Sequence, residues 1–133
     1  MSAKSAIYLD SSALVKLVIA EPESGALRRS LRRHQPHVTS ALARTEVARA
    51  TMSFGTEAVV RGEAVLRRVE VVRLNDRVLR IAGSLEPAEL RSLDAIHLAT
   101  AQLIGAELKW IITYDERLAD AAHKLGLSVR APA

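Results

Sequence analysis

The sequence contains no cysteine, only 3% aromatic residues and no long apolar run. Without cysteine the chain can form neither a disulfide framework nor a thiolate metal site. The apolar stretch at residues 13–20 includes Lys16 and is shorter than the roughly 18–20 residues that span a bilayer, and the first residues lack the layout of a signal peptide. We therefore expect a cytoplasmic protein with no membrane partner.

The chain has 133 residues, of which 49% are hydrophobic and 26% charged, and it shows no internal repeat or low-complexity segment. This length and composition predict one globular domain over residues 1–133 with a buried core. The formal net charge is +4, and arginine supplies most of the positive charge. A basic balance favours an anionic partner, nucleic acid first, although an arginine-rich genome composition would produce the same excess.

Residues 6–9 form a short apolar run that ends at Asp10 and is followed by Ser11 and Ser12. Such a run is typical of a buried strand, and either serine can cap the helix that follows. Asp10 is therefore expected where a strand ends and a helix begins, which is the edge at which open α/β sheets bind ligands. A carboxylate in this position indicates chemistry rather than packing.

Strands and helices are predicted to alternate along the rest of the chain. This alternation indicates an α/β domain with a mainly parallel central sheet of about four to five strands flanked by helices. The further helices are predicted at residues 24–33, 41–53, 56–68, 74–85, between 91 and 105, and at 116–124, and the further strands at 36–39, 69–72, around 110–112 and at 127–129.

Glu46 shares one face of the helix at 41–53 with the apolar residues Leu42 and Ala50, so we expect it to point toward the core. A glutamate in that position costs free energy unless it is paired or bound to a cation. The alternative is an exposed ion pair with Arg49, three residues further on.

Two aspartates stand at other element boundaries. Asp94 lies in the first turn of a helix that is apolar nearly all round and is therefore buried. It is either an ordinary helix-start charge, which the helix macrodipole favours, or a carboxylate that enters the interior. Asp115 follows the apolar run at 110–112 and is either a carboxylate at the sheet edge or simply the N-cap of the next helix.

The C-terminal ends of parallel strands lie together, so Asp10 and Asp115 are expected to converge, with Glu46 and Asp94 added by neighbouring helices. Two carboxylates about 4 Å apart repel by roughly 4 kcal/mol at an effective dielectric near 20, so such a cluster must take up protons or hold a cation. Oxygen ligands without cysteine or a histidine pair favour Mg²⁺, or Mn²⁺, over zinc. The predicted reaction is therefore metal-assisted phosphodiester hydrolysis.

Other polar residues are candidates for supporting roles. His97, one turn after Asp94, is either a proton carrier or a core histidine that hydrogen-bonds a neighbour. Ser11 and Thr113 are expected to position water or to tether a carboxylate. The helix at 24–33 carries a basic stripe that either contacts RNA phosphates or is a solvated face. This stripe consists of Arg28, Arg29, Arg32 and Arg33.

Four short segments resemble, in the right order, the motifs of PIN-domain ribonucleases, specifically the VapC-type toxins of bacterial toxin–antitoxin pairs. They are residues 8–12, 40–46, 93–101 and 113–118, and the third is the most specific match. The resemblance implies a three-layer-like PIN domain and a Mg²⁺- or Mn²⁺-dependent endoribonuclease that cleaves structured RNA, such as tRNA or rRNA, and so stops translation. It also implies a homodimer and a cognate VapB-like antitoxin that occupies the active site.

The resemblance assigns the family's acidic set to Asp10, Glu46, Asp94 and Asp115, with Asp120 as an alternative for the fourth position. It implies that Asp10 and Asp94 are the main metal ligands and that the other two complete the cluster directly or through water. In-line attack by water would leave 5′-phosphate and 3′-hydroxyl ends. A mechanism driven by histidine would instead use the 2′-OH of the RNA and leave a cyclic phosphate.

Two other functions fit part of the sequence. Aspartyl phosphotransferases and dehalogenase-like enzymes also place an aspartate after the first strand, but they usually carry a second acid two residues on, where this chain has Ser12. A non-catalytic RNA-binding or partner-binding domain would leave the acidic residues idle, and the presence of all four argues against it.

Overall fold

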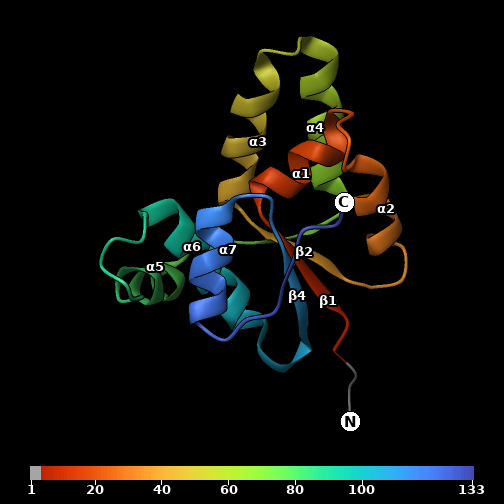
Figure 1. Cartoon of the computed structure of the whole chain (residues 1–133). Helices are drawn as coiled ribbons and strands as arrows, with labels where there is room; N and C mark the ends of the chain where they lie inside the picture. The colour runs from red at the N-terminus through yellow and green to blue at the C-terminus, as the bar shows by residue number, and fades with distance from the viewer. Residues whose placement is uncertain (1–3) are drawn as a thin grey trace.

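A computed structural model describes residues 4–133 and shows a five-stranded sheet with the strand order β3-β2-β1-β4-β5, in which every pairing is parallel. Helices lie on both faces of this sheet (Figure 1). The strands are β1 (Ala6–Leu9), β2 (His37–Ser40), β3 (Glu70–Val72), β4 (Leu108–Ile112) and β5 (Val129–Arg130). The predicted α/β class with a parallel central sheet is confirmed.

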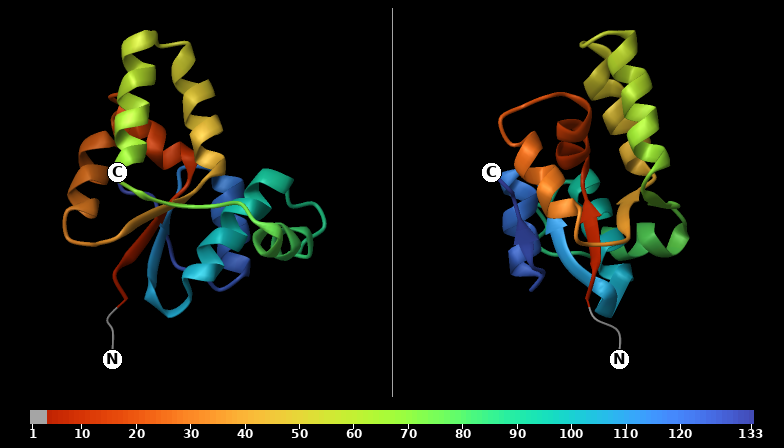
Figure 2. Two further views of the ribbon diagram at one scale, coloured as in Figure 1. Left: turned by 180° about the vertical axis from the view of Figure 1, so that it is seen from behind. Right: turned by 90° about the vertical axis from the view of Figure 1, so that its right-hand side faces the viewer.

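The helices form one layer on each face and a projecting pair. In Figure 1, α2 lies to the right of the strands, whereas α5, α6 and α7 lie to the left; α3 and α4 project as a hairpin beyond the ends of the strands, as both views in Figure 2 also show. The helices are α1 (Ser11–Val18), α2 (Ser24–Leu31), α3 (Leu42–Met52), α4 (Thr56–Arg67), α5 (Asp76–Gly83), α6 (Ser92–Ile104) and α7 (Glu116–Lys124), with a 3₁₀ turn, η1 (Gly105–Glu107), before β4.

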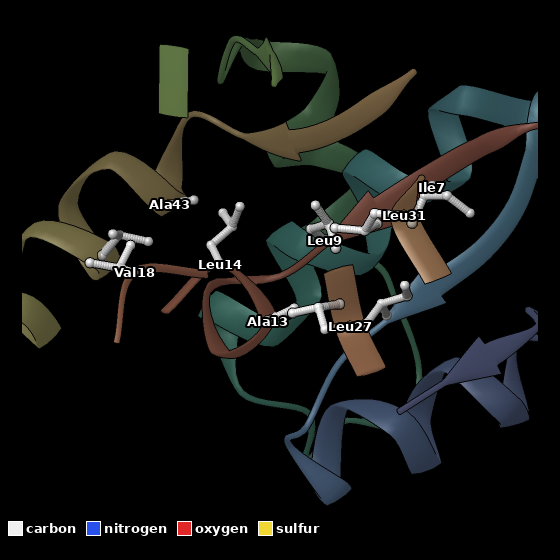
Figure 3. Close-up of a cluster of buried hydrophobic side chains, with 10 residues drawn as sticks. Ile7, Leu9, Ala13, Leu14, Val18, Leu27, Leu31 and Ala43 are labelled. Carbon is white, nitrogen blue, oxygen red and sulfur yellow. The ribbon is translucent and has the colours of Figure 1, made fainter. Parts of the chain in front are cut away.

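The central strand β1 is buried on both faces, since each of its four residues is at most 1% exposed. Ile7 and Leu9 pack against α1 and α2, whose Leu14 and Leu27 lie beside them in Figure 3, and Tyr8 points to the opposite face. Burial of such a side chain is worth about 1.5–3 kcal/mol, so β1 is held rigidly. The backbone of Asp10, the residue that follows β1, is therefore fixed in position.

The start of α1 differs from the prediction. Its N-cap is Asp10, whose Oδ1 accepts a hydrogen bond from the backbone N–H of Ala13 at 3.0 Å, and neither Ser11 nor Ser12 has this role. Aspartate caps as well as serine does, because its carboxylate also complements the helix dipole. The serine hydroxyls are thereby left for other contacts.

The ends of the other helices agree with the predicted spans to within two residues, and Gly105 closes α6 with a φ of 67°. The helix predicted at residues 24–33 ends at Leu31, so the last two arginines of the predicted stripe lie beyond it. Within residues 4–133, no helix combines the length and apolar character that crossing a membrane requires.

Candidate active site

Asp10 lies at the C-terminal edge of the sheet and is 4% exposed. Its Oδ1 accepts hydrogen bonds from Ser12 Oγ at 2.7 Å and from the backbone N–H of Ala13 at 3.0 Å, and its Oδ2 accepts one from Thr113 Oγ1 at 2.6 Å. Burial raises the pKa of the Asp10 carboxyl, and these hydrogen bonds offset only part of that rise. The carboxylate is thus rigidly oriented and short of positive charge.

The register between β1 and β4 brings Thr113 to Asp10. Leu9 is paired with Ile112, so the next residue of each strand emerges at the same level of the edge. Thr113 Oγ1 also accepts a hydrogen bond from the backbone N–H of Asp115 at 3.1 Å. The predicted tethering role of Thr113 is therefore seen in its contacts: one hydroxyl orients both the buried carboxylate and the loop that carries another acid.

Ser12 makes a similar link and was missed as a supporting residue, because the prediction named only Ser11 of the two serines. Its Oγ donates to Asp10 Oδ1 and accepts from the backbone N–H of Tyr114 at 2.9 Å. The two residues are only two positions apart, so their spacing was an available signal. Ser11, the serine that was predicted, also tethers a carboxylate, since it donates to Glu46 Oε1 at 2.5 Å.

We expect Thr113→Val to lower the free energy of unfolding by about 1.5–3 kcal/mol, because it removes a hydrogen bond to a buried charged group without changing side-chain volume. Chemical denaturation at neutral pH measures the change. The matched control is Thr100→Val, at a buried threonine whose hydroxyl only donates to the carbonyl of Ile96 in its own helix. Equal losses in the two variants would show that the Thr113–Asp10 bond has no special weight.

Glu46 faces the interior, as its helix position predicted, and it pairs with His97 rather than with Arg49. The distance from His97 Nε2 to Glu46 Oε1 is 2.7 Å, and His97 Nδ1 lies 2.6 Å from the hydroxyl of Tyr8. His97 is 3% exposed. Both ring nitrogens of His97 are thus in contact with protein groups, Nε2 with the Glu46 carboxylate and Nδ1 with the Tyr8 hydroxyl. This chain of side chains joins β1, α3 and α6 beneath the site.

The contacts favour a positioning role for His97 over that of a proton carrier, because both of its ring nitrogens are engaged by protein groups. Burial raises the pKa of the Glu46 carboxyl, but the hydrogen bonds from His97 and Ser11 outweigh it, and the net pKa is lowered. Glu46 is therefore ionised at neutral pH.

Asp94 faces the same region from the start of α6 and is half-buried. Its pKa is raised, first by burial and then by repulsion from Asp115, with a smaller contribution from Asp10; the charges of His97 and Arg91 act in the opposite direction. The carboxylates at the end of β1 and in the loop after β4 are therefore close enough to Asp94, at the start of α6, to destabilise its ionised form. Of the four acids expected to converge, Asp94 lies within electrostatic reach of Asp115 and Asp10, whereas Glu46 is held by His97 and Ser11.

Asp115 also has the second role that its position suggested. Its Oδ1 accepts from the backbone N–H groups of Arg117 at 2.9 Å and Leu118 at 3.4 Å, so it is the N-cap of α7. Asp120, the alternative fourth acid, is exposed on α7. It lines a hollow of about 290 Å³ beside Asp94, whose other charged lining residues are Glu89, Arg91, Arg117 and Lys124.

The fit of this site to a metal ion rests on the chemistry of its donors. Within residues 4–133, no three acidic or histidine side chains are gathered closely enough to form a ready coordination sphere. Yet Asp10, Asp94 and Asp115 are oxygen donors, and a divalent cation would relieve the repulsion that Asp115 and Asp10 exert on Asp94. Glu46 is already occupied by His97 and Ser11. The residues present thus fit a hard divalent ion held by the three aspartates.

The basic stripe lies apart from these acids. In Figure 1 its helix, α2, lies across the sheet from α6 and α7. The four arginine side chains are all exposed, two on α2 and two in the turn that follows. They are not in contact with the carboxylates in any hydrogen bond or ion pair of the described residues.

Comparison with known proteins shows similarity over nearly the whole chain. The family model described as PIN domain matches residues 7–124. The ribonuclease VapC46 of Mycobacterium tuberculosis is 56% identical over 127 residues, which cover 96% of this chain and 98% of that protein. The ribonuclease VapC35 of the same species is 43% identical over 130 residues, covering 95% of this chain and 96% of that protein.

Solved structures share the fold at lower identity. A toxin–antitoxin complex from Klebsiella pneumoniae contains a chain that is 24% identical with a TM-score of 0.73, and the match covers 97% of this chain and 98% of that one. The Mycobacterium tuberculosis protein VapC20, described as a toxin that cleaves the sarcin-ricin loop, is 20% identical with a TM-score of 0.70, covering 86% and 94% of the two chains. These likenesses concern the fold alone.

Proposed function

Because this chain belongs to the PIN-domain family, among its VapC-type toxin ribonucleases, we propose that it is a Mg²⁺-dependent endoribonuclease whose acidic edge is the active site. Its relatives are ribonucleases, and VapC-type PIN-domain enzymes generally depend on a divalent metal ion. The observation that supports the site most directly is the repulsion that Asp115 and Asp10 exert on Asp94, because the three residues belong to separate parts of the chain.

In this proposal, Asp10 and Asp94 are the main metal ligands, and Asp115 completes the set directly or through water. A bound Mg²⁺ or Mn²⁺ would supply an activated water and neutralise charge that develops on the phosphate. Thr113 and Ser12 hold both oxygens of Asp10 in a fixed orientation. Glu46, which His97 and Ser11 hold in one orientation, would orient the attacking water.

The substrate that we propose is structured RNA, either tRNA or rRNA, whose cleavage would stop translation in the cytoplasm. VapC20, with the same fold, is described as cleaving the sarcin-ricin loop, which is such a structure. The partner is an antitoxin, since similar chains are found in toxin–antitoxin complexes. We further propose that the antitoxin is VapB-like and covers the acidic edge, and that the toxin is a homodimer.

The test is cleavage of total tRNA and rRNA by the purified chain, with and without Mg²⁺, followed by analysis of the new ends. We expect cleavage that EDTA abolishes and Mg²⁺ or Mn²⁺ restores, with 5′-phosphate and 3′-hydroxyl products. Cyclic phosphate ends that persist in EDTA would assign the reaction to histidine-driven chemistry and contradict the proposed role of the aspartates. A chain that binds RNA but leaves it intact with either ion would support the non-catalytic alternative.

A further inference from the structure

A second hollow, of about 470 Å³, lies on the α2 side of the sheet, where the turn after α2 approaches β4. Its lining combines basic side chains with the only tryptophan of the sequence. The lining residues are Arg29, Ser30, Arg32, Arg33, His34 and Trp110. None of them is acidic, in contrast with the hollow beside Asp94. We call this feature the arginine–tryptophan pocket.

Trp110 is the centre of this pocket and is only half-buried. The ring of His34 meets it edge to face, with 5.0 Å between centroids. Two cations lie over the indole: Lys109 Nζ and the guanidinium carbon of Arg130 are each 5.1 Å from its centroid. A partly exposed aromatic ring with cations around it can bind a flat ring by stacking. The cations then favour a ligand whose flat ring is attached to a negatively charged group.

The charges around the pocket repel one another, and none of the ion pairs found in residues 4–133 involves its arginines. Burial lowers the pKa of His34, and repulsion from Lys109 and from Arg33 lowers it further. Lys16 shows the opposite situation elsewhere on this face of the sheet, because it pairs with Glu21 and Glu23. The arginine–tryptophan pocket is therefore a site where an external anion would relieve repulsion.

We propose that the arginine–tryptophan pocket binds an unpaired segment of the RNA substrate, with a base against Trp110 and the adjoining phosphates on Arg29, Arg32 and Arg33. Lys109 and Arg130 are long and flexible, so a base that covers the indole displaces one of them toward a neighbouring phosphate. This inference rests on the proposed ribonuclease function. Of the four arginines in the predicted basic stripe, three line the pocket and Arg28 does not.

The position of the pocket suits a substrate that also reaches the acidic edge. Trp110 and Thr113 belong to β4 and the residue after it, and three residues of extended chain span about 10 Å. An RNA strand that contacts both the pocket and Asp10 must therefore run from the α2 side of the sheet to its C-terminal edge. The pocket would hold the substrate near the cleavage site without taking part in the chemistry.

An RNA segment fits these observations better than an acidic peptide. Guanidinium groups recognise either carboxylates or phosphates, but a half-exposed indole adds affinity mainly for a flat ring that can stack on it. Stacking on an aromatic side chain also tolerates any base, so this site is expected to add affinity rather than sequence preference.

The test uses the intrinsic fluorescence of Trp110, because the chain has no other tryptophan. The full chain is titrated in EDTA with a short oligouridylate, and separately with a polyglutamate peptide. We expect saturable quenching by the RNA, which weakens as salt rises. Arg29→Ala/Arg33→Ala should reduce the slope of log affinity against log salt by about 1.4, at about 0.7 for each lost phosphate contact. The control Arg77→Ala/Arg80→Ala removes two exposed arginines of α5 and should leave the slope nearly unchanged.

Trp110→Leu should weaken binding of a labelled oligouridylate about 10-fold, and Trp110→Phe, which keeps a stacking ring and guards against loss of packing, should recover most of it. RNA binding without a change in Trp110 fluorescence, or no binding at all, overturns the pocket even if the protein cleaves RNA with Mg²⁺. Equal quenching by polyglutamate reassigns the pocket to an acidic peptide. Quenching by RNA in a chain that cleaves no RNA retains the pocket and refutes the proposed function instead.

Discussion

Asp10→Asn is expected to reduce ribonuclease activity at least about 100-fold while the protein remains folded. Loss of a charged ligand from a metal-assisted hydrolase removes several kcal/mol of transition-state stabilisation, and each 1.36 kcal/mol is tenfold in rate. The fold should persist because asparagine has the same shape and its oxygen can still accept from Ser12 and Ala13, while the Thr113 hydroxyl can accept from its amide. Initial rates on tRNA with saturating Mg²⁺ measure the loss.

The control for this experiment is Asp76→Asn, which makes the same chemical change at an exposed position on α5. Its rate should stay within about twofold of the wild type, since surface substitutions away from a site have small effects. A folded Asp10→Asn protein with wild-type activity would remove Asp10 from the reaction and with it the proposed metal site.

In EDTA, the free energy of unfolding is expected to fall as the pH rises above the ordinary range of aspartate. Asp10 and Asp94 have raised pKa values in the folded state, so they bind their protons more tightly there than in the unfolded chain. Such groups contribute stability that is present below their ordinary pKa and lost as the pH rises through the raised values. Glu46, whose pKa is lowered, acts in the opposite direction: its contribution is present above its ordinary pKa and is lost as the pH falls through the lowered value.

Addition of Mg²⁺ should reverse this loss, because an ion that binds only the folded state stabilises it by about 2.7 kcal/mol at 100 times its Kd. Urea unfolding at several pH values, with EDTA and with excess Mg²⁺, measures both effects. In Asp10→Asn the fall with pH should be smaller and the Mg²⁺ response should be nearly absent, and Asp76→Asn should behave like the wild type. A Mg²⁺ response of equal size in Asp10→Asn would show that the ion binds elsewhere.

Much of the candidate site could be predicted from local patterns. An apolar run that ends in an aspartate can be recognised in the sequence, because a buried strand and the helix after it each favour particular residues. This pattern predicted the positions of Asp10 and Asp115 at the sheet edge. The helical period likewise placed Glu46 toward the interior. In each case one element was enough to determine where the backbone would carry the side chain.

The partners of those side chains were less accessible to prediction. Glu46 had Arg49 as a candidate partner on its own helix, but it pairs with His97, 51 residues away. Asp10 itself is the N-cap of α1, and its carboxylate accepts hydrogen bonds from Ser12 and Thr113. The register of β1 and β4 brings the Thr113 hydroxyl to it. The grouping of the arginines also depends on tertiary structure. Three arginines of the predicted stripe line a pocket with Trp110 because the turn after α2 approaches β4.

The linear order of residues by itself determined the α/β class, the edge positions of the acidic residues and the excess of arginine, because hydrophobic period, strand length and net charge are properties of short stretches. The packing of β1 against β4 and of α6 against the sheet decided which carboxylates repel one another, which histidine tethers Glu46 and which cations surround Trp110. Those relations depend on distances between residues remote in the chain, and such distances exist only once the sheet has formed and its helices have closed over both faces.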